Sequence, residues 1–220
     1  MTDPLAVLQR IRHTTPREIP RAGEVCELCA EPIGDEHGHL VDVVERNLMC
    51  ACRGCFLLFT SDGAGGGHFK SVPERYLSFP EFTLSPGQWD NLQIPVSVAF
   101  FFLNSALDRV AAFYPGPAGA TESELPLDTW AEVVEANPAL SSLQPDVEAF
   151  LVRSRPNQGG TECYIVPIDV CYELVGHLRT LWRGFDGGKE ANAKLDAFFG
   201  DVQARATAAE MDAAAGANSQ

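Results

Sequence analysis

Two Cys-x-x-Cys pairs constrain the fold of this chain more than any other feature of its sequence. Cys26 and Cys29 form the first pair, Cys52 and Cys55 form the second, and 22 residues separate the pairs. Two residues between cysteines let both thiolates bind one ion, and two such pairs complete a tetrahedral site. We therefore expect these four cysteines to bind a metal ion, with zinc as the ion and iron in a rubredoxin-like site as the alternative.

The residues around the pairs indicate how this module folds. Apolar and polar residues alternate from His39 to Leu48, which is typical of a β-hairpin, and an apolar run, FLLF, follows the second pair. The order of knuckle, hairpin and knuckle predicts a small treble-clef or zinc-ribbon-like module. The glycines within residues 63–67 predict a flexible hairpin tip, because no Lys-Ser/Thr pair follows them as in a phosphate-binding loop.

Three further residues could act as ligands. Cys50 is expected to end the hairpin and point away from the ion, or else to replace one of the four cysteines as ligand. His37 and His39 flank Gly38 and could both project from one side of the hairpin toward the ion. We interpret them as exposed imidazoles of a polar turn, since four cysteines already complete a closed site.

The whole chain is expected to divide into an N-terminal helix and linker (1–23), the metal module (24–70), a mixed α+β domain with a mainly antiparallel sheet (71–202) and a tail (203–220). A change to aromatic and β-branched segments after residue 70, separated by Pro/Gly turns, indicates the second domain. Its apolar patterns predict strands at 96–102, 109–114, 147–153 and 163–166, and helices at 128–135, 170–183 and 189–203. We expect the first two of these helices to cover one face of the sheet.

The net charge of the chain limits the kinds of partner that it can bind. The chain has 30 acidic and 16 basic residues, a net charge of -14. Such a field repels phosphate backbones, so we expect no nucleic-acid partner. Between Asp108 and Glu148 there are eight acids and a single base, Arg109, which predicts an acidic face suited either to solubility or to a basic protein partner.

The cysteine count and the hydropathy bear on location. Seven cysteines, an odd number, fit metal ligands and buried thiols better than disulfides. The N-terminal residues lack the apolar core of an export signal, and the longest apolar run, at 94–103, is about half of the roughly 20 residues that a membrane helix needs. We therefore expect a cytoplasmic protein without a membrane partner.

No catalytic set is evident in the second domain. Cys163 and Cys171 lie in apolar surroundings and are expected to pack in the core, and His177 is badly spaced to activate Cys171. A histidine pair between two cysteine pairs resembles the HNH nucleases, but only 12 residues separate His39 from Cys52 and the chain is acidic. An enzyme is therefore the third choice, after an adaptor protein and an electron carrier.

Several longer stretches carry a resemblance that spans residues 24–199. They are CELC, EHGHLVD, CACRGCFLLF, QWDNLQIPVSVAFFF, AFYPGPAGATES, NPALSSLQPDVEAFLVR and VPIDVCYELVGHLRTLWRGFDGG. These are similar to an uncharacterised bacterial family often encoded beside high-affinity uptake nickel-iron hydrogenases. The resemblance implies a non-catalytic accessory protein whose partner is a hydrogenase subunit or maturation factor, and it provides no catalytic residues.

Overall fold

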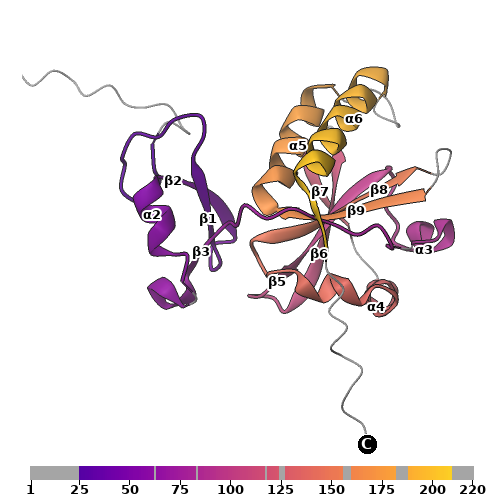
Figure 1. Cartoon of the computed structure of the whole chain (residues 1–220), viewed down its shortest axis with the longest axis horizontal. Helices are drawn as coiled ribbons and strands as arrows, with labels where there is room; N and C mark the ends of the chain where they lie inside the picture. The colour runs from indigo at the N-terminus through magenta and orange to yellow at the C-terminus, as the bar shows by residue number, and fades with distance from the viewer. Residues whose placement is uncertain are drawn as a thin grey trace, which may run out of the picture.

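The computed structural model describes residues 25–61, 63–82, 84–116, 118–123, 127–155, 160–181 and 188–209. The helix expected within residues 1–23 lies outside this part of the chain. The described residues form a small unit that contains the cysteine pairs and a larger α+β unit, joined by residues 72–76 (Figure 1).

The small unit is built on a short antiparallel sheet of order β2-β1-β3. The hairpin of β1 (Gly38–Asp42) and β2 (Asn47–Ala51) matches the predicted one, and its register places His39 opposite Cys50. Helix α2 (Arg53–Leu58) follows, and β3 (Phe69–Ser71) then pairs with β1. The glycine-rich segment is not a hairpin tip. It forms the 3-10 turn η1 (Ala64–Gly67), which leads from α2 to β3 through positive-φ glycines.

Helix α2 packs on the start of the hairpin. A Cβ atom on Gly38 would lie 2.5 Å from the Cδ2 atom of Phe56, so only glycine permits this contact. Beneath it, Cys26, Leu40 and Ala51 form the buried core of the small unit. So small a core gives limited hydrophobic stabilisation, and small folds of this kind usually need a metal or disulfides.

The larger unit contains one mainly antiparallel sheet, as predicted. In the described residues its strand order is β10-β4-β9-β8-β5-β6-β7, and only β10 and β4 run parallel. The four predicted strands are confirmed, with bounds that differ by up to three residues. The strands are β4 (Leu77–Ser78), β5 (Val98–Asn104), β6 (Arg109–Gly116), β7 (Gly119–Ser123), β8 (Glu148–Arg155), β9 (Gly160–Pro167) and β10 (Thr207–Ala208).

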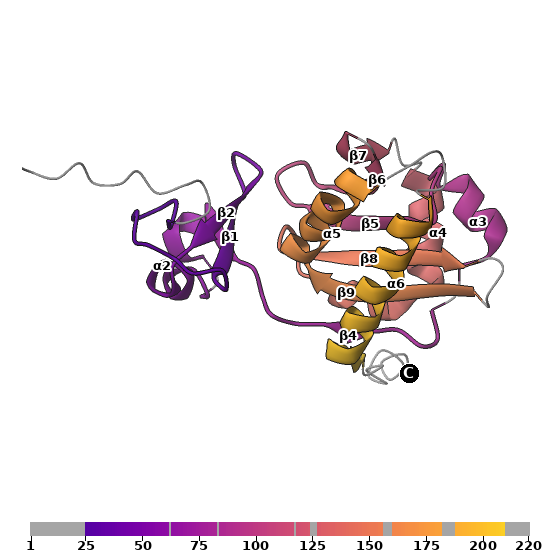
Figure 2. The same cartoon turned by 90° about the horizontal axis from the view of Figure 1, so that it is seen from above.

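Helices cover both faces of this sheet (Figure 2). Helices α5 (Ile168–Leu181) and α6 (Gly188–Arg205) pack on one face, whereas α3 (Pro86–Asn91), α4 (Leu127–Ala136) and the 3-10 turn η2 (Pro138–Ser142) belong to the other. The prediction that α4 and α5 share a face was therefore wrong. Strand β5 is buried on both faces, with Phe100 packed toward α5 and Phe101 toward α4, so a helix is needed on each side.

The C-terminal boundary also differs from the expected tail at 203–220. Helix α6 continues to Arg205, whose guanidinium lies 3.9 Å from the ring centroid of Tyr76. Strand β10 then runs beside β4, with a hydrogen bond of 3.1 Å from the Thr207 amide to the Tyr76 carbonyl oxygen. Backbone pairing of this kind leaves no apolar periodicity in the sequence. Residues 210–220 are outside the described chain.

Opposite charges connect the small unit and residues 72–76 to the larger unit. Lys70 contacts buried Asp146 at 2.7 Å, and Arg75 contacts fully buried Glu148 through two hydrogen bonds of 2.8 and 2.6 Å. These two acids were expected on an exposed acidic face. Both are instead internal partners of basic residues that precede the larger unit.

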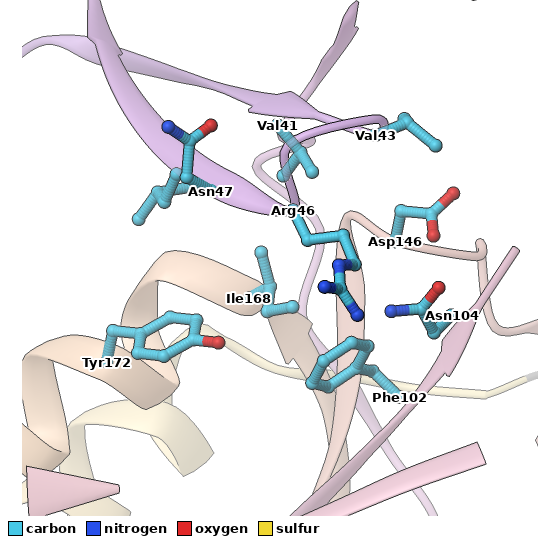
Figure 3. A pocket seen from close by; sticks show the side chains of 10 residues that line it. Val41, Val43, Arg46, Asn47, Phe102, Asn104, Asp146, Ile168 and Tyr172 are labelled. Atoms are coloured by element: carbon cyan, nitrogen blue, oxygen red, sulfur yellow. The ribbon is translucent and has the colours of Figure 1, made fainter. Parts of the chain in front are cut away.

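The two units also share apolar contacts. Val41 of β1 and Val72 belong to the same buried cluster as α5 and α6. A cavity of about 50 Å³ remains between the units, and Figure 3 shows Arg46 extending into it toward Phe102. Among the described residues, no helix combines the length and apolar character that a membrane crossing requires.

Candidate metal centre

The structure brings the four paired cysteines together. The sulfur atoms of Cys26, Cys29, Cys52 and Cys55 all lie within 4.8 Å of one another. Those of Cys29 and Cys52, one from each pair, are 3.6 Å apart. Cys26 is buried and Cys29 is exposed, so the cluster lies at the edge of the small core.

The first pair lies in a tight turn held by backbone hydrogen bonds. The amide of Cys26 donates to the carbonyl oxygen of Glu31 at 2.8 Å, and the amide of Ala30 donates to that of Cys26 at 2.8 Å. Ala30 adopts a positive φ of 60° to close this turn. The Glu27 amide donates to the Cys50 carbonyl oxygen at 3.0 Å, which connects the turn to β2.

The second pair lies at the start of α2. Cys52 is the residue before the helix, and its sulfur accepts a hydrogen bond from the Cys55 amide at 3.4 Å. The second pair therefore follows the hairpin directly and enters a helix. The chain order is a cysteine turn, a β-hairpin and a helix with cysteines at its start.

The four thiols differ in acidity. Burial raises the pKa of Cys26, but hydrogen bonds from backbone amides, chiefly those of Cys52 and Cys29, outweigh burial and lower this pKa to about 6. Burial and the neighbouring cysteine side chains raise the pKa of Cys55 to about 12. The pKa values of these two neighbouring thiols are thus shifted in opposite directions. A divalent cation would supply the positive charge that allows all four to ionise together.

Cys50, His37 and His39 form a separate cluster. One ligand atom from each lies within 4.8 Å of the others, and all three residues are half-buried. The two imidazole rings are 4.8 Å apart between centroids. The interpretation of these histidines as exposed was therefore wrong, because both are half-buried, and the hairpin register places His39 opposite Cys50.

Each histidine uses its Nδ1 atom in a contact outside the cluster. His37 Nδ1 is 2.8 Å from the carbonyl oxygen of Gly34, and His39 Nδ1 is 2.7 Å from Oδ2 of Asp169. Asp169 is in the first turn of α5, in the larger unit. Local sequence patterns could not identify it as a neighbour of His39, because 129 residues separate the two.

The remaining cysteines are core residues, as predicted. Cys163 and Cys171 are buried in the larger unit, and burial raises the pKa of both thiols far above the ordinary value. His177 is exposed and pairs with Glu173 at 3.2 Å, one turn earlier in α5. These groups do not converge on a site in the described structure.

A comparison with known families matches a region that contains both clusters to a single family. The model described as "Family of unknown function (DUF5947)" matches residues 25–206, which include all seven residues of the two clusters. No curated protein and no solved structure matches the chain. Because the match spans most of the sequence, the chain belongs to DUF5947, a family of unknown function.

Proposed function

We propose that Cys26, Cys29, Cys52 and Cys55 bind one zinc ion that stabilises a treble-clef-like module in a non-catalytic accessory protein. The observation that carries this proposal is the convergence of four cysteine sulfurs within 4.8 Å, from a turn and from a helix start. Four thiolates make a closed site, which is the form that structural zinc takes.

The distance between one sulfur of each pair fits a tetrahedral ion. Two sulfurs each about 2.3 Å from a tetrahedral zinc ion lie about 3.8 Å apart. Cys29 and Cys52 have their sulfurs 3.6 Å apart. The same sulfurs could hold iron, but neither pair has the Cys-Pro-x-Cys-Gly sequence of rubredoxin, which favours zinc.

The small core supports a stabilising role for the ion. The buried cluster of the small unit consists of Cys26, Leu40 and Ala51, and one of these is itself a proposed ligand. Metal binding to such a unit contributes directly to its folding free energy. A reduced compartment, the cytoplasm, would keep the thiols available for the ion.

The proposed role is to connect proteins. The resemblance to a family encoded beside nickel-iron hydrogenases favours a hydrogenase subunit or maturation factor as the partner.

The substitution Cys55→Ser tests this proposal. It should remove the zinc ion held by the four cysteines, so that the chain binds one zinc fewer than the wild type, and it should make amides of residues 25–71 exchange hydrogen much faster, while β5, β8 and β9 stay protected. Cys163→Ala is the matched control, since it removes a buried thiol outside the cluster, and it should retain the zinc. Elemental analysis and hydrogen-deuterium exchange measure both properties.

Two results would contradict the proposal. If Cys55→Ser kept the zinc content of the wild type and its protected amides, Cys55 would not be a ligand. If the whole chain lost protection, the small unit would not be a separately stabilised module.

A further inference from the structure

We infer that His37, His39 and Cys50 form a second metal site, separate from the four-cysteine cluster and open at its fourth position. This inference goes beyond the proposed function, because it concerns different side chains and a second ion. A ring nitrogen of each histidine and the sulfur of Cys50 lie within 4.8 Å of one another.

The β-hairpin itself brings these residues together. His39 and Cys50 are direct partners in the antiparallel register of β1 and β2, and His37 precedes β1 by one residue. The Glu27 carboxylate accepts a hydrogen bond of 2.6 Å from the Cys50 amide, which connects this strand to the first cysteine turn. Backbone structure, and not long mobile side chains, therefore positions the cluster.

The hydrogen bonds of the histidines leave the Nε2 atoms to bind an ion. With Nδ1–H donating to the Gly34 carbonyl oxygen, the lone pair of His37 is on Nε2. That Nε2 atom is buried and makes no hydrogen bond within the described part of the chain. A buried nitrogen without a partner is costly, and a bound cation would satisfy it.

His39 has the arrangement common to metal-binding histidines. Its Nδ1 atom lies 2.7 Å from the Asp169 carboxylate, and this contact orients the ring and leaves Nε2 as the ligand atom. A carboxylate on the distal nitrogen also makes an imidazole a stronger ligand. Because Asp169 belongs to α5, an ion at this site would be connected to the larger unit as well as to the hairpin.

The ligand set indicates the class of ion. Two imidazoles and one thiolate suit zinc and other divalent first-row transition ions of intermediate softness. Three protein ligands leave one tetrahedral position for water or another exchangeable group, which distinguishes this site from the closed four-thiolate cluster. The second ion is therefore expected to exchange more readily than the first.

Anaerobic titration of the reduced, metal-free full chain with Co²⁺ and then Zn²⁺ tests the inference. The wild-type chain should bind two equivalents, and the second Co²⁺ equivalent should show the weaker sulfur charge-transfer absorption of one thiolate. His37→Ala and Cys50→Ser should each bind one equivalent, with the absorption of four thiolates retained. His177→Ala is the matched control, since His177 is exposed on α5, and it should bind two.

Asp169→Asn tests the positioning role of this carboxylate. It should weaken the second equivalent by about 10- to 100-fold and leave the affinity of the first unchanged. A merely structural loss would instead change both affinities or the fold, which circular dichroism would report.

The outcomes separate this inference from the four-cysteine proposal. A wild-type stoichiometry of one, unchanged in His37→Ala and Cys50→Ser, would overturn the second site. A loss in Cys50→Ser without a loss in His37→Ala would also overturn it, since Cys50 would then serve the four-cysteine cluster. If one equivalent required His37 and Cys50 but no four-thiolate absorption appeared, the second site would stand and the four-cysteine proposal would fail.

Discussion

Asp42 is the residue that holds the turn between β1 and β2. Its Oδ1 atom accepts hydrogen bonds from the amides of Val44 and Glu45, at 3.0 and 2.8 Å. His68 Nε2 lies 3.0 Å from the same oxygen. Because this hairpin carries His39 and Cys50, the turn positions part of the proposed second site.

These contacts predict a specific pH dependence. The hydrogen bond from the Glu45 amide, supported by His68, lowers the pKa of Asp42 below its ordinary value of 3.8. The folded chain then binds fewer protons than the unfolded chain just below pH 3.8, so stability falls as the pH falls. The contribution should be fully present above about pH 4.

Urea unfolding of the wild type and Asp42→Asn between pH 2 and 7 measures this effect. The difference in unfolding free energy between the two proteins should shrink from its value near about pH 5 as the pH falls through the folded-state pKa of Asp42. His68→Ala should move that decline to higher pH, because it removes one cause of the lowered pKa. A difference that stayed constant down to pH 2 would show that Asp42 makes no charge-dependent contribution.

The sequence predicts the four-cysteine cluster well and the cluster of His37, His39 and Cys50 poorly. The four-cysteine cluster is predictable from local spacing, because two intervening residues suffice to bring the sulfurs of each pair together. Its members are Cys26, Cys29, Cys52 and Cys55. The second cluster depends on the pairing of His39 with Cys50 across the hairpin. It also depends on Asp169, a contact between units that local spacing does not contain.

Helix α5 shows how a single element fixes the larger unit. Its buried residues recur every three or four positions, and they face the sheet: Ile168, Cys171, Leu174, Val175 and Leu178. Its first turn also carries Asp169, which contacts His39. Packing of this helix therefore determines the position of one group in the candidate site.

Truncation of Leu178 tests the packing of α5. Leu178 is fully buried, and Leu178→Ala should lower the free energy of unfolding by about 2–5 kcal/mol, because it removes buried methyl groups and leaves a cavity. Leu107→Ala is the control in the same unit. Leu107 is 44% exposed, so its truncation should change the free energy by less than about 0.5 kcal/mol.

The free energy of unfolding is measured by denaturant unfolding, with the intrinsic fluorescence of the larger unit as the signal. Equal effects of the two substitutions would contradict a core centred on α5.

The long, strongly apolar strands and helices were predictable from the sequence, and the short ones were not. Strands β5, β6, β8 and β9 follow from their composition, whereas β7 lies in a Gly/Pro-rich stretch and is held by backbone pairing to β6. Helix α3 was missed, although Ser85 and Gln88 form a capping box around Pro86 that marks its start. The unbroken apolar run in β5 was the signal that both faces of the sheet are covered.

In the whole molecule, charged pairs join the two units. Lys70 and Arg75 contact Asp146 and Glu148, and His39 contacts Asp169. Composition alone predicted an acidic surface between residues 108 and 148. It could not show that two of those acids are buried beside basic residues from a segment about 75 positions earlier in the chain.

The two proposed metal sites differ in their relation to the contact between the units. The proposed zinc site at the four cysteines lies within the small unit, whereas the proposed second site spans the contact with α5 through Asp169. In our proposal, the folding of the small unit therefore depends on the four-cysteine site.

The most direct test of that account is the metal content of the full chain with the substitution Cys50→Ser, purified without added metal. This variant keeps the four paired cysteines and removes a ligand of the proposed second site, so only the four-cysteine site should remain. Elemental analysis should find one zinc per chain, and the visible absorption spectrum should be featureless. A metal-free folded chain, or iron with sulfur charge-transfer bands, would contradict a structural zinc site at Cys26, Cys29, Cys52 and Cys55.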